Sequence, residues 1–212
     1  KNFTKYWTVG EEGAAKALQT FIRNTLHGYQ QGRNIPSRAH TSKLSPHLHF
    51  GEISPRQIWY ALHAISQSNV ATLKDSEIFI SQLGWREFST HLLHHAPTLP
   101  SKPFRPQFEK FPWQKNAKLL SAWQKGKTGF PLIDAGMREL WHTGWMHNRI
   151  RMIVASFLTK NALIHWHEGE NWFWDTLVDA DLANNAASWQ WVAGSGVDAA
   201  PYFRIFNPVT QS

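Results

Sequence analysis

Cysteine is absent from the 212-residue sequence. Its absence excludes disulfide bonds, cysteine-ligated zinc and iron–sulfur clusters, and it is compatible with a reducing compartment. No apolar run approaches the roughly 20 residues that a membrane-spanning helix needs. Neither a GxGxxG motif nor a Walker A motif occurs, so a Rossmann or P-loop nucleotide site is not supported. Convincing alternation of apolar and polar residues is also missing, which leaves helices as the expected elements.

Acidic residues are scarce relative to basic ones. The chain has 15 Asp and Glu but 22 Lys and Arg, which gives a net charge of +7 and a pI of about 9.8. This balance favours an anionic partner, with nucleic acid ahead of a membrane surface. Because the chain begins at Lys1 and not at methionine, we interpret residues 1–212 as one domain of a longer protein, truncated at both ends. A processed small protein is the alternative.

Helical periodicity dominates the sequence and predicts an all-α fold with one globular domain. Serine followed by proline marks one helix start at Ser54-Pro55, and a proline marks another at Pro131. The expected helices cover 11–27, 55–65, 75–92, 131–140, 149–164, 170–178 and 181–191. The segments 28–45 and 96–113 are expected to be loops. The second holds five prolines together with aromatic residues, so we expect it to pack over the core.

The helix expected after Met146 carries polar groups on a mostly apolar surface. Asn148, Arg151 and Met152 share one face by their i, i+3 and i+4 spacing. Arg149 points elsewhere, as suits a contact with phosphate. Buried polar groups are costly unless they are paired, so this face indicates either a polar ligand or an internal partner.

Two carboxylates and an amide follow towards the C-terminal end. Asp179 and Asp181 are the nearest acceptors in sequence for Arg151, and a structural ion pair is the alternative to a ligand site. Asp181 and Asn185 share a face, with Trp189 one turn later. Because neighbouring carboxylates repel, a cation or a donor-rich ligand such as ribose is expected to hold them. Acid–base catalysis is the rival interpretation, but no third group completes such a site.

The loop 41–45 carries three hydroxyls and a lysine, and it leads into Pro46, an expected helix start. Hydroxyls and backbone N–H groups before a helix can bind phosphate, although an ordinary capping loop has the same composition. Histidines also occur in close pairs, but metal-binding helices commonly use i, i+4 spacing, so no metal site is expected. The pairs are His47-x-His49, His94-His95 and His165-x-His167.

Twelve tryptophans are too many for packing to be the only role considered. Trp113, Trp166 and Trp189 lie far apart in sequence but can converge in a helical fold. Tryptophan can stack on bases or carry electrons between a cofactor and the surface, whereas an unselected tryptophan is expected in the core.

Several long motifs, in order along residues 5–212, resemble the photolyase/cryptochrome family, and most of all its microbial members that repair cyclobutane pyrimidine dimers. They are WREF (85–88), GKTGFPLIDAGMREL (126–140), GWMHNRIRM (144–152), DADLANN (179–185), WQW (189–191) and DAAPYFRIFNP (198–208). The resemblance implies the helical FAD-binding domain of that family. It further implies that the N-terminal α/β antenna domain, with its chromophore, and the last part of the helical domain are absent.

The resemblance implies one non-covalent FAD, held by residues that match the family's cofactor contacts. The implied phosphate-binding residues are Tyr29, Thr41, Ser42, Lys43, Leu44 and Ser45. Arg86, Asn148 and Arg151 match residues around the flavin and phosphates, and Asp179 and Asp181 match those that contact the isoalloxazine and ribose. Asn185 matches the residue that faces flavin N5, where a neutral amide suits the fully reduced anionic flavin.

The resemblance also implies an electron-transfer chain and a lesion pocket. Trp113, Trp166 and Trp189 match the tryptophans that photoreduce the flavin. The lesion-contacting residues implied are Gln82, Trp85, Asn148, Met152 and Trp191, and the DNA contacts are Arg149 and Gln211. Relatives that repair (6-4) photoproducts place two histidines where this chain has Asn148 and Met152, which favours the cyclobutane dimer. One departure is Gln82, where dimer-repair enzymes usually have glutamate.

The function implied is light-driven repair of a flipped-out pyrimidine dimer in UV-damaged DNA by electron transfer from excited reduced flavin. A cytoplasmic, monomeric lyase without a membrane partner is implied as well. A cryptochrome-type photoreceptor without repair activity is one alternative, and a flavin-free, basic, aromatic nucleic-acid-binding domain is the other.

Overall fold

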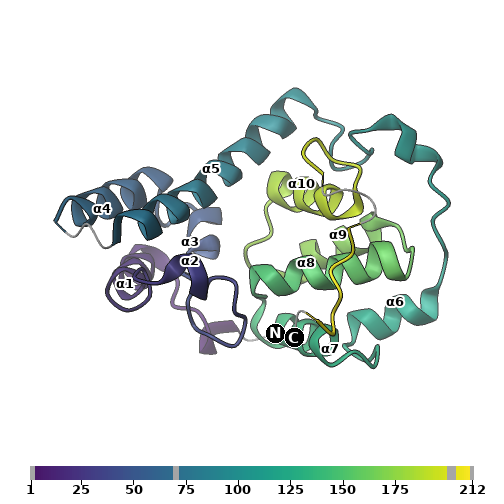
Figure 1. The fold of residues 1–212 in the computed structure, drawn as a ribbon, viewed down its shortest axis with the longest axis horizontal. Coiled ribbons are helices and arrows are strands. Elements are labelled where there is room, and N and C mark those ends of the chain that lie inside the picture. Colours follow the sequence, from purple (N-terminus) through teal and green to yellow (C-terminus); the bar gives the residue numbers. More distant parts are fainter. Residues whose placement is uncertain (1–2, 69–71, 200–203, 211–212) are drawn as a thin grey trace. The chain divides into compact units, whose positions relative to one another are not determined.

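Helix α5 (Leu73–His95) contains the point at which the contacts divide the chain into two compact units. Unit 1 is Lys1–Phe88 and unit 2 is Ser89–Ser212. The computed structural model describes residues 3–68, 72–199 and 204–210, and within these ranges it contains helices and no strand (Figure 1). The all-α fold is therefore confirmed, whereas a single domain over 1–212 stays a prediction.

Unit 1 packs short and long helices around an aromatic centre. They are η1 (Phe3–Lys5), α1 (Gly10–Asn24), α2 (Tyr29–Gly32), α3 (Ser45–His49), α4 (Pro55–Ser68) and the first part of α5. The rings of Phe21, Tyr29 and Phe79 contact one another with centroids 4.5–5.4 Å apart. These rings come from α1, α2 and α5, so the core of unit 1 fixes where α2 lies against α5.

Capping groups explain two boundaries in unit 1. The hydroxyl of Ser54 accepts the N–H of Gln57 at 3.2 Å, which confirms the predicted start of α4. Asp75, which could have capped α5, lies in the first turn of that helix and caps another element. Its carboxylate accepts the N–H groups of Gly28 at 2.8 Å and Gln30 at 2.7 Å, because the left-handed turn at Gly28 leaves these donors at the start of α2.

Unit 2 is built around helices α8, α9 and α10, and α10 contacts both of the others (Figure 1). Its elements after α5 are η3 (Pro106–Lys110), α6 (Ala117–Gln124), α7 (Pro131–Thr143), α8 (Asn148–Ser156), η4 (Phe157–Asn161), α9 (Trp166–Thr176) and α10 (Leu182–Ala193). The start of α7 at Pro131 agrees with the sequence. Trp123, Trp166 and Trp189 are among the fully or nearly fully buried side chains of its core.

Two features of unit 2 differ from the sequence prediction. The single helix expected over 149–164 is wrong: α8 ends at Ser156 and one π-helical turn, η4, follows. The chain then bends through Leu163, whose φ of 52° lies in the left-handed region. Helix α6 was not predicted, although Asn116 caps it by accepting the N–H of Leu119 at 2.9 Å. No helix in the described ranges is both long and apolar enough to cross a membrane.

Candidate functional site

The hydroxyl-rich loop of unit 1 lies between α2 and α3. Thr41 and Ser42 are half-buried, and the Ser42 hydroxyl accepts the N–H of Leu44 at 3.3 Å. Lys43 adopts a φ of 53°, a conformation that non-glycine residues rarely take outside constrained loops. Leu44 is buried, and Ser45 is the exposed first residue of α3. The loop thus has a defined shape and presents hydroxyls and a lysine, which are chemically suited to phosphate.

Other predicted cofactor residues of unit 1 gather around this loop. His40, at the entrance to the loop, packs so closely on Gly32 of α2 that a Cβ there would lie 2.4 Å from its ring. Tyr29, at the start of α2, is buried, and burial raises its pKa. The Arg86 guanidinium reaches the Leu48 carbonyl of α3 at 3.5 Å and lies 3.0 Å from Glu87. Helices α2, α3 and α5 therefore bring the predicted residues of this unit together.

Arg33 is a residue of this region that sequence reasoning missed. Its guanidinium donates to Oε1 of Gln82 at 2.9 Å and lies over the Tyr29 ring, 5.6 Å from the centroid. The Gln82 amide also donates to Ile78 O at 3.1 Å and to the Ser81 hydroxyl at 3.0 Å. Both ends of the Gln82 amide are thus engaged within unit 1. The i, i+4 spacing of Tyr29 and Arg33 was the available signal.

Trp85, one turn after Gln82 on α5, is an exposed predicted lesion contact. Its side chain is 54% exposed, and its ring meets Phe88 edge-on at 5.8 Å. An exposed tryptophan on a rigid helix can stack on a base without first leaving the core.

In unit 2, Arg151 finds its acceptor inside the chain. Its Nη2 lies 2.8 Å from Oδ2 of the buried Asp179, and its Nε donates to the Met146 carbonyl at 2.8 Å. Asp181 takes no part in this pair. It caps α10 by accepting the N–H of Asn184 at 2.9 Å, so each of the two carboxylates has a partner within the chain.

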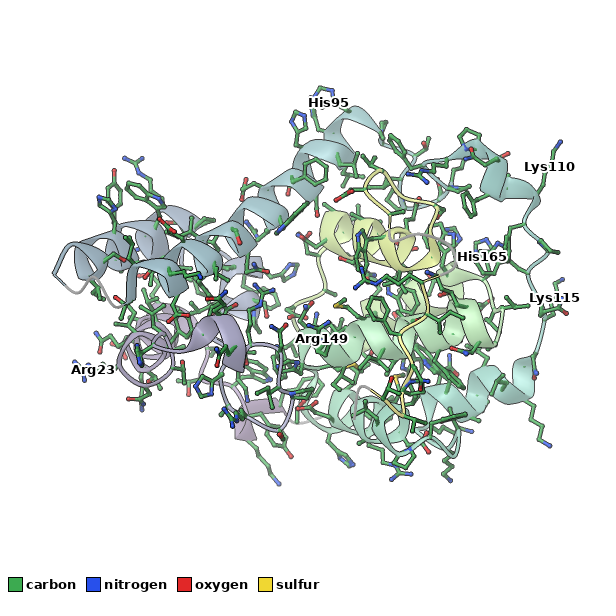
Figure 2. The ribbon with its side chains drawn as sticks, viewed as in Figure 1. Arg23, His95, Lys110, Lys115, Arg149 and His165 are labelled. Atoms are coloured by element: carbon green, nitrogen blue, oxygen red, sulfur yellow. The ribbon has the colours of Figure 1, made fainter. Side chains whose placement is uncertain are left out.

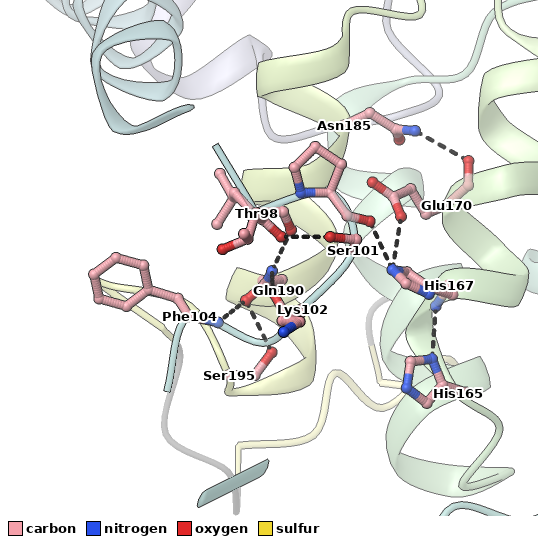
Figure 3. A network of polar contacts seen from close by, with 12 residues as sticks. Thr98, Ser101, Lys102, Phe104, His165, His167, Glu170, Asn185, Gln190 and Ser195 are labelled. Carbon is pink, nitrogen blue, oxygen red and sulfur yellow. Dashed lines mark hydrogen bonds and ion pairs between the residues drawn. The ribbon is translucent and has the colours of Figure 1, made fainter. Parts of the chain in front are cut away.

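Asn185 is held at one end. Its Nδ2 donates to the backbone carbonyl of Glu170 at 3.0 Å, which orients the side chain from α10 towards α9 (Figure 3). This bond leaves Oδ1 as an acceptor, and within the described residues that atom has no hydrogen bond. A fixed acceptor of this kind suits a ligand N–H group.

Glu170 and His167 on α9 form a titratable pair that sequence reasoning did not single out. The Glu170 side chain is buried, and burial raises the pKa of its carboxyl group to about 7. His167 Nε2 lies 3.6 Å from Oε2 of Glu170 and 2.7 Å from the Pro100 carbonyl (Figure 3). Their i, i+3 spacing was visible in the sequence, but burial depends on the packing of distant segments.

The three selected tryptophans all lie in unit 2. Trp166 and Trp189 are buried, and Trp113 is half-buried in the segment before α6. The Trp189 ring covers Gly169, where a Cβ would lie 2.0 Å from Cη2 of the indole. Because Gly169 follows Trp166 by one helical turn, the Trp189 indole contacts α9 one turn from Trp166.

The remaining predicted contacts with DNA are on α8 and α10. Asn148, exposed at the start of α8, donates to Sδ of Met152 at 3.8 Å, so these two residues do share a face. Arg149 is half-buried on the same helix and is labelled in Figure 2. Trp191 stacks on Phe206 with centroids 6.1 Å apart. Gln211 lies outside the described residues.

A buried glutamine holds the proline-rich segment against α10 (Figure 3). The side chain of Gln190 donates to the carbonyls of Leu99 at 2.6 Å and Lys102 at 2.8 Å, and accepts the N–H of Phe104 at 2.7 Å. It is fully buried, so these bonds satisfy an amide that would otherwise be costly. The expectation that this segment packs over the core is therefore confirmed.

These features fit a helical domain that binds a polar ligand beside buried tryptophans. Residues 79–212 match the family described as "FAD binding domain of DNA photolyase", and the chain belongs to that family. It is 54% identical over 211 residues to the deoxyribodipyrimidine photo-lyase of Agrobacterium fabrum, covering 100% of this chain and 44% of that protein. The chain therefore spans less than half the length of that relative.

The chain is also similar to a cryptochrome and to a photolyase of known structure. The chain is 40% identical over 207 residues to cryptochrome-1 of Arabidopsis thaliana, covering 95% of this chain and 30% of that protein. The crystal structure of a class III photolyase from Agrobacterium tumefaciens superposes with a TM-score of 0.90 at 53% identity, covering 99% of this chain and 43% of that one.

Proposed function

We propose that this chain is the FAD-binding part of a light-driven lyase that repairs cyclobutane pyrimidine dimers in UV-damaged DNA. The observation that carries the proposal is Asn185, whose amide is fixed by the Glu170 carbonyl and whose oxygen is a ready acceptor beside buried Trp189. When bound and reduced, FAD would supply the photoexcited electron that opens the dimer and recover it afterwards. The family and the relatives named photo-lyase support this assignment.

The donor groups described within each unit suit a non-covalent FAD, and we propose one FAD for the chain. In unit 1, the phosphates would be bound by the loop 41–45 with Tyr29 and Arg86. In unit 2, Asn185 would accept a flavin N–H group, and the acidic residues would read the ring and ribose. The residues proposed there are Asn148, Arg151, Asp179 and Asp181. Arg151 would orient Asp179 through their 2.8 Å ion pair, so that one carboxylate oxygen is held in place.

The DNA lesion would be bound by aromatic and polar side chains. Trp85 and Trp191 would stack on the flipped-out bases, and Met152 would supply an apolar wall. Asn148 and Met152 carry no acid–base group, which supports the cyclobutane dimer over the (6-4) photoproduct. Arg149 and Gln211 would contact the neighbouring DNA.

Trp113, Trp166 and Trp189 would return the flavin to its reduced state, one electron at a time. Trp189 would donate first, Trp166 would refill Trp189, and Trp113 would refill Trp166. The Trp189 indole packs on Gly169, which is one helical turn from Trp166, and this supports transfer between these two tryptophans.

The test is illumination of an oligonucleotide that carries one cyclobutane thymine dimer, with the FAD-loaded protein. We expect loss of dimers in the light, none in the dark, and no change in an oligonucleotide that carries a (6-4) photoproduct. Trp85→Ala should weaken binding of the dimer by about 1–3 kcal/mol. Trp174→Ala, which removes a similarly exposed tryptophan of α9, should not. Dimers that persist under light with flavin bound would contradict repair.

A cryptochrome-type photoreceptor is the second candidate, and Gln82 is the observation that favours it. Both N–H groups of its amide donate to Ile78 and Ser81, and Arg33 occupies one lone pair of Oε1, so only the second lone pair is left for a thymine edge. Photoreduction without dimer repair would support this candidate. Purified protein that is colourless and cannot be reconstituted with FAD would favour a flavin-free DNA-binding domain.

A further inference from the structure

The imidazole ring of His165 lies between the rings of Trp113 and Trp166. Its centroid is 5.2 Å from that of Trp113, in an edge-on arrangement, and 5.5 Å from that of Trp166, in a stacked arrangement with an interplanar angle of 27°. Among the described residues, His165 is the only ring that contacts both tryptophans. Figure 2 labels it on the segment that leads into α9.

The backbone on both sides holds this arrangement in place. The N–H of Gln114, next to Trp113, donates to the Leu163 carbonyl at 2.7 Å. Leu163 takes its left-handed conformation two residues before His165, and the N–H of Ile164 donates to the Leu158 carbonyl at 3.0 Å. The segment that carries Trp113 is therefore tied to the turn that carries His165.

The surroundings of His165 keep its ring neutral. Its Nδ1 accepts the N–H of His167 at 3.2 Å as the N-cap of α9, and a protonated Nδ1 cannot accept (Figure 3). Burial lowers the pKa of His165, and the neighbouring His167 lowers it further. The helix N-terminus also disfavours positive charge. The titratable groups that face it are His167, with its centroid 5.1 Å away, and Glu170 behind His167.

We propose that His165 is a positioning residue for electron transfer from Trp113 to Trp166, an inference that rests on the proposed function. The step moves one electron: Trp166, oxidised by Trp189, is reduced while Trp113 is oxidised. The Trp113 radical cation then loses its indole proton to water, and an external thiol supplies the electron and the proton that restore Trp113, leaving a thiyl radical that pairs with another to form a disulfide. A neutral bridging ring keeps the two indoles in register and adds no positive charge that would repel the hole as it passes.

The test separates the ring of His165 from its capping role. His165→Asn keeps a good N-cap acceptor but removes the ring, whereas His165→Phe keeps a ring but removes the cap. Oxidation of Trp113 is followed by transient absorption in the FAD-loaded protein after a light pulse. We expect a several-fold slower step in the Asn variant and a rate close to that of the unchanged protein in the Phe variant. Urea unfolding checks that both variants are folded.

A second readout needs no flavin. Protonated histidine quenches the fluorescence of a neighbouring indole, so the emission of the flavin-free protein should fall on acidification. We expect a component of the quenching with a midpoint below the usual histidine pKa to be lost in His165→Phe, whereas quenching by other histidine–tryptophan pairs, such as His167 with Trp166, remains. An unchanged titration in that variant contradicts the proposal.

Three kinetic results would also overturn the proposal: equal rates in all forms, slowing in the Phe variant alone, or equal slowing in both. Trp113→Phe serves as the reference for the chain itself. If photoreduction stays normal in Trp113→Phe, the proposed electron-transfer chain is wrong. If Trp113→Phe slows photoreduction but both His165 variants react at the rate of the unchanged protein, the electron-transfer chain is supported and the role of His165 is wrong.

Discussion

Glu170 is a buried carboxyl group whose surroundings favour its protonated form. Burial raises its pKa to about 7, well above the usual range for glutamate. The folded protein therefore binds a proton that the unfolded chain releases at pH values between about 4.5 and 7. The free energy of unfolding should fall as pH rises through this window, because the folded state must then hold a buried charge.

Glu170→Gln is expected to remove this pH dependence, since a neutral amide resembles the protonated carboxyl. Above pH 7 the variant should be the more stable protein, by up to about 3 kcal/mol from the size of the shift. Below pH 4.5 the two should differ little. Urea unfolding at pH 5, 7 and 8.5 measures the effect. Glu168→Gln, at an exposed position two residues earlier, is the matched control, and an equal effect there contradicts the explanation.

The sequence limited the possible ion-pair partners of a residue to a few candidates, but it did not identify which candidate forms the pair. Arg151 in an apolar helix required an acceptor, and Asp179 and Asp181 were the candidates. Two residues apart, these carboxylates look equivalent in sequence. The start of α10 distinguishes the two carboxylates. Asp181 is the N-cap and accepts a helix N–H group, whereas Asp179 forms the ion pair with the Arg151 guanidinium at 2.8 Å. The raised pKa of Glu170 could not be predicted from sequence, because the burial that causes it depends on segments that are distant along the chain.

At the scale of elements, the contact of α9 with α10 depends on a missing side chain. Gly169 leaves the space into which the Trp189 indole packs, and a Cβ there would lie 2.0 Å from the ring. The ring is buried on all sides and has little freedom to move away.

Gly169→Ala should therefore destabilise the protein by about 1–3 kcal/mol, although alanine is the better helix former. Gly84→Ala is the matched control, because Gly84 is exposed in α5 and no atom lies within 4 Å of its added Cβ. That variant should gain up to about 1 kcal/mol. Urea unfolding, followed by circular dichroism, compares them. Equal changes in stability for Gly169→Ala and Gly84→Ala would show that the packing of Trp189 does not require the missing side chain at Gly169.

Helices with a local start signal were predictable, and those shaped by tertiary contacts were not. Proline and capping residues marked α4 and α7 in the sequence. The break after Ser156 was hidden, because residues 149–164 contain no proline or glycine to mark the π-helical turn or the left-handed Leu163. Helix α6 is short and follows a loop rich in proline, so its period was too brief to stand out.

At the scale of the molecule, the net charge of +7 is the property that bears on DNA. Helical periodicity predicted the all-α fold, and the family resemblance added the FAD-binding family, which composition and periodicity alone left open. Charge alone indicated an anionic partner without saying which residues meet it. The assignment of Arg149 to the DNA backbone therefore makes a quantitative expectation about salt.

DNA binding should weaken linearly in log–log form as salt rises, and Arg149→Gln should reduce the slope by about 0.9, the contribution of one phosphate contact. Damaged and undamaged duplexes should lose affinity alike, because a phosphate contact reads no sequence. Arg23→Gln is the control, since it removes the same charge from an exposed position on α1 (Figure 2). Fluorescence anisotropy measures the affinity for DNA at salt concentrations between about 50 and 300 mM. Equal slopes for both variants would contradict the assignment.

Gln190 has a consequence for how this part of the chain can be altered. The segment that contains Leu99, Lys102 and Phe104 follows α5 without regular structure of its own up to η3, and one amide on α10 makes three hydrogen bonds to it. Its conformation is thus encoded about ninety residues away, at a position that a local comparison of loops would overlook. A transplant of this segment into another helical scaffold would need the glutamine to travel with it.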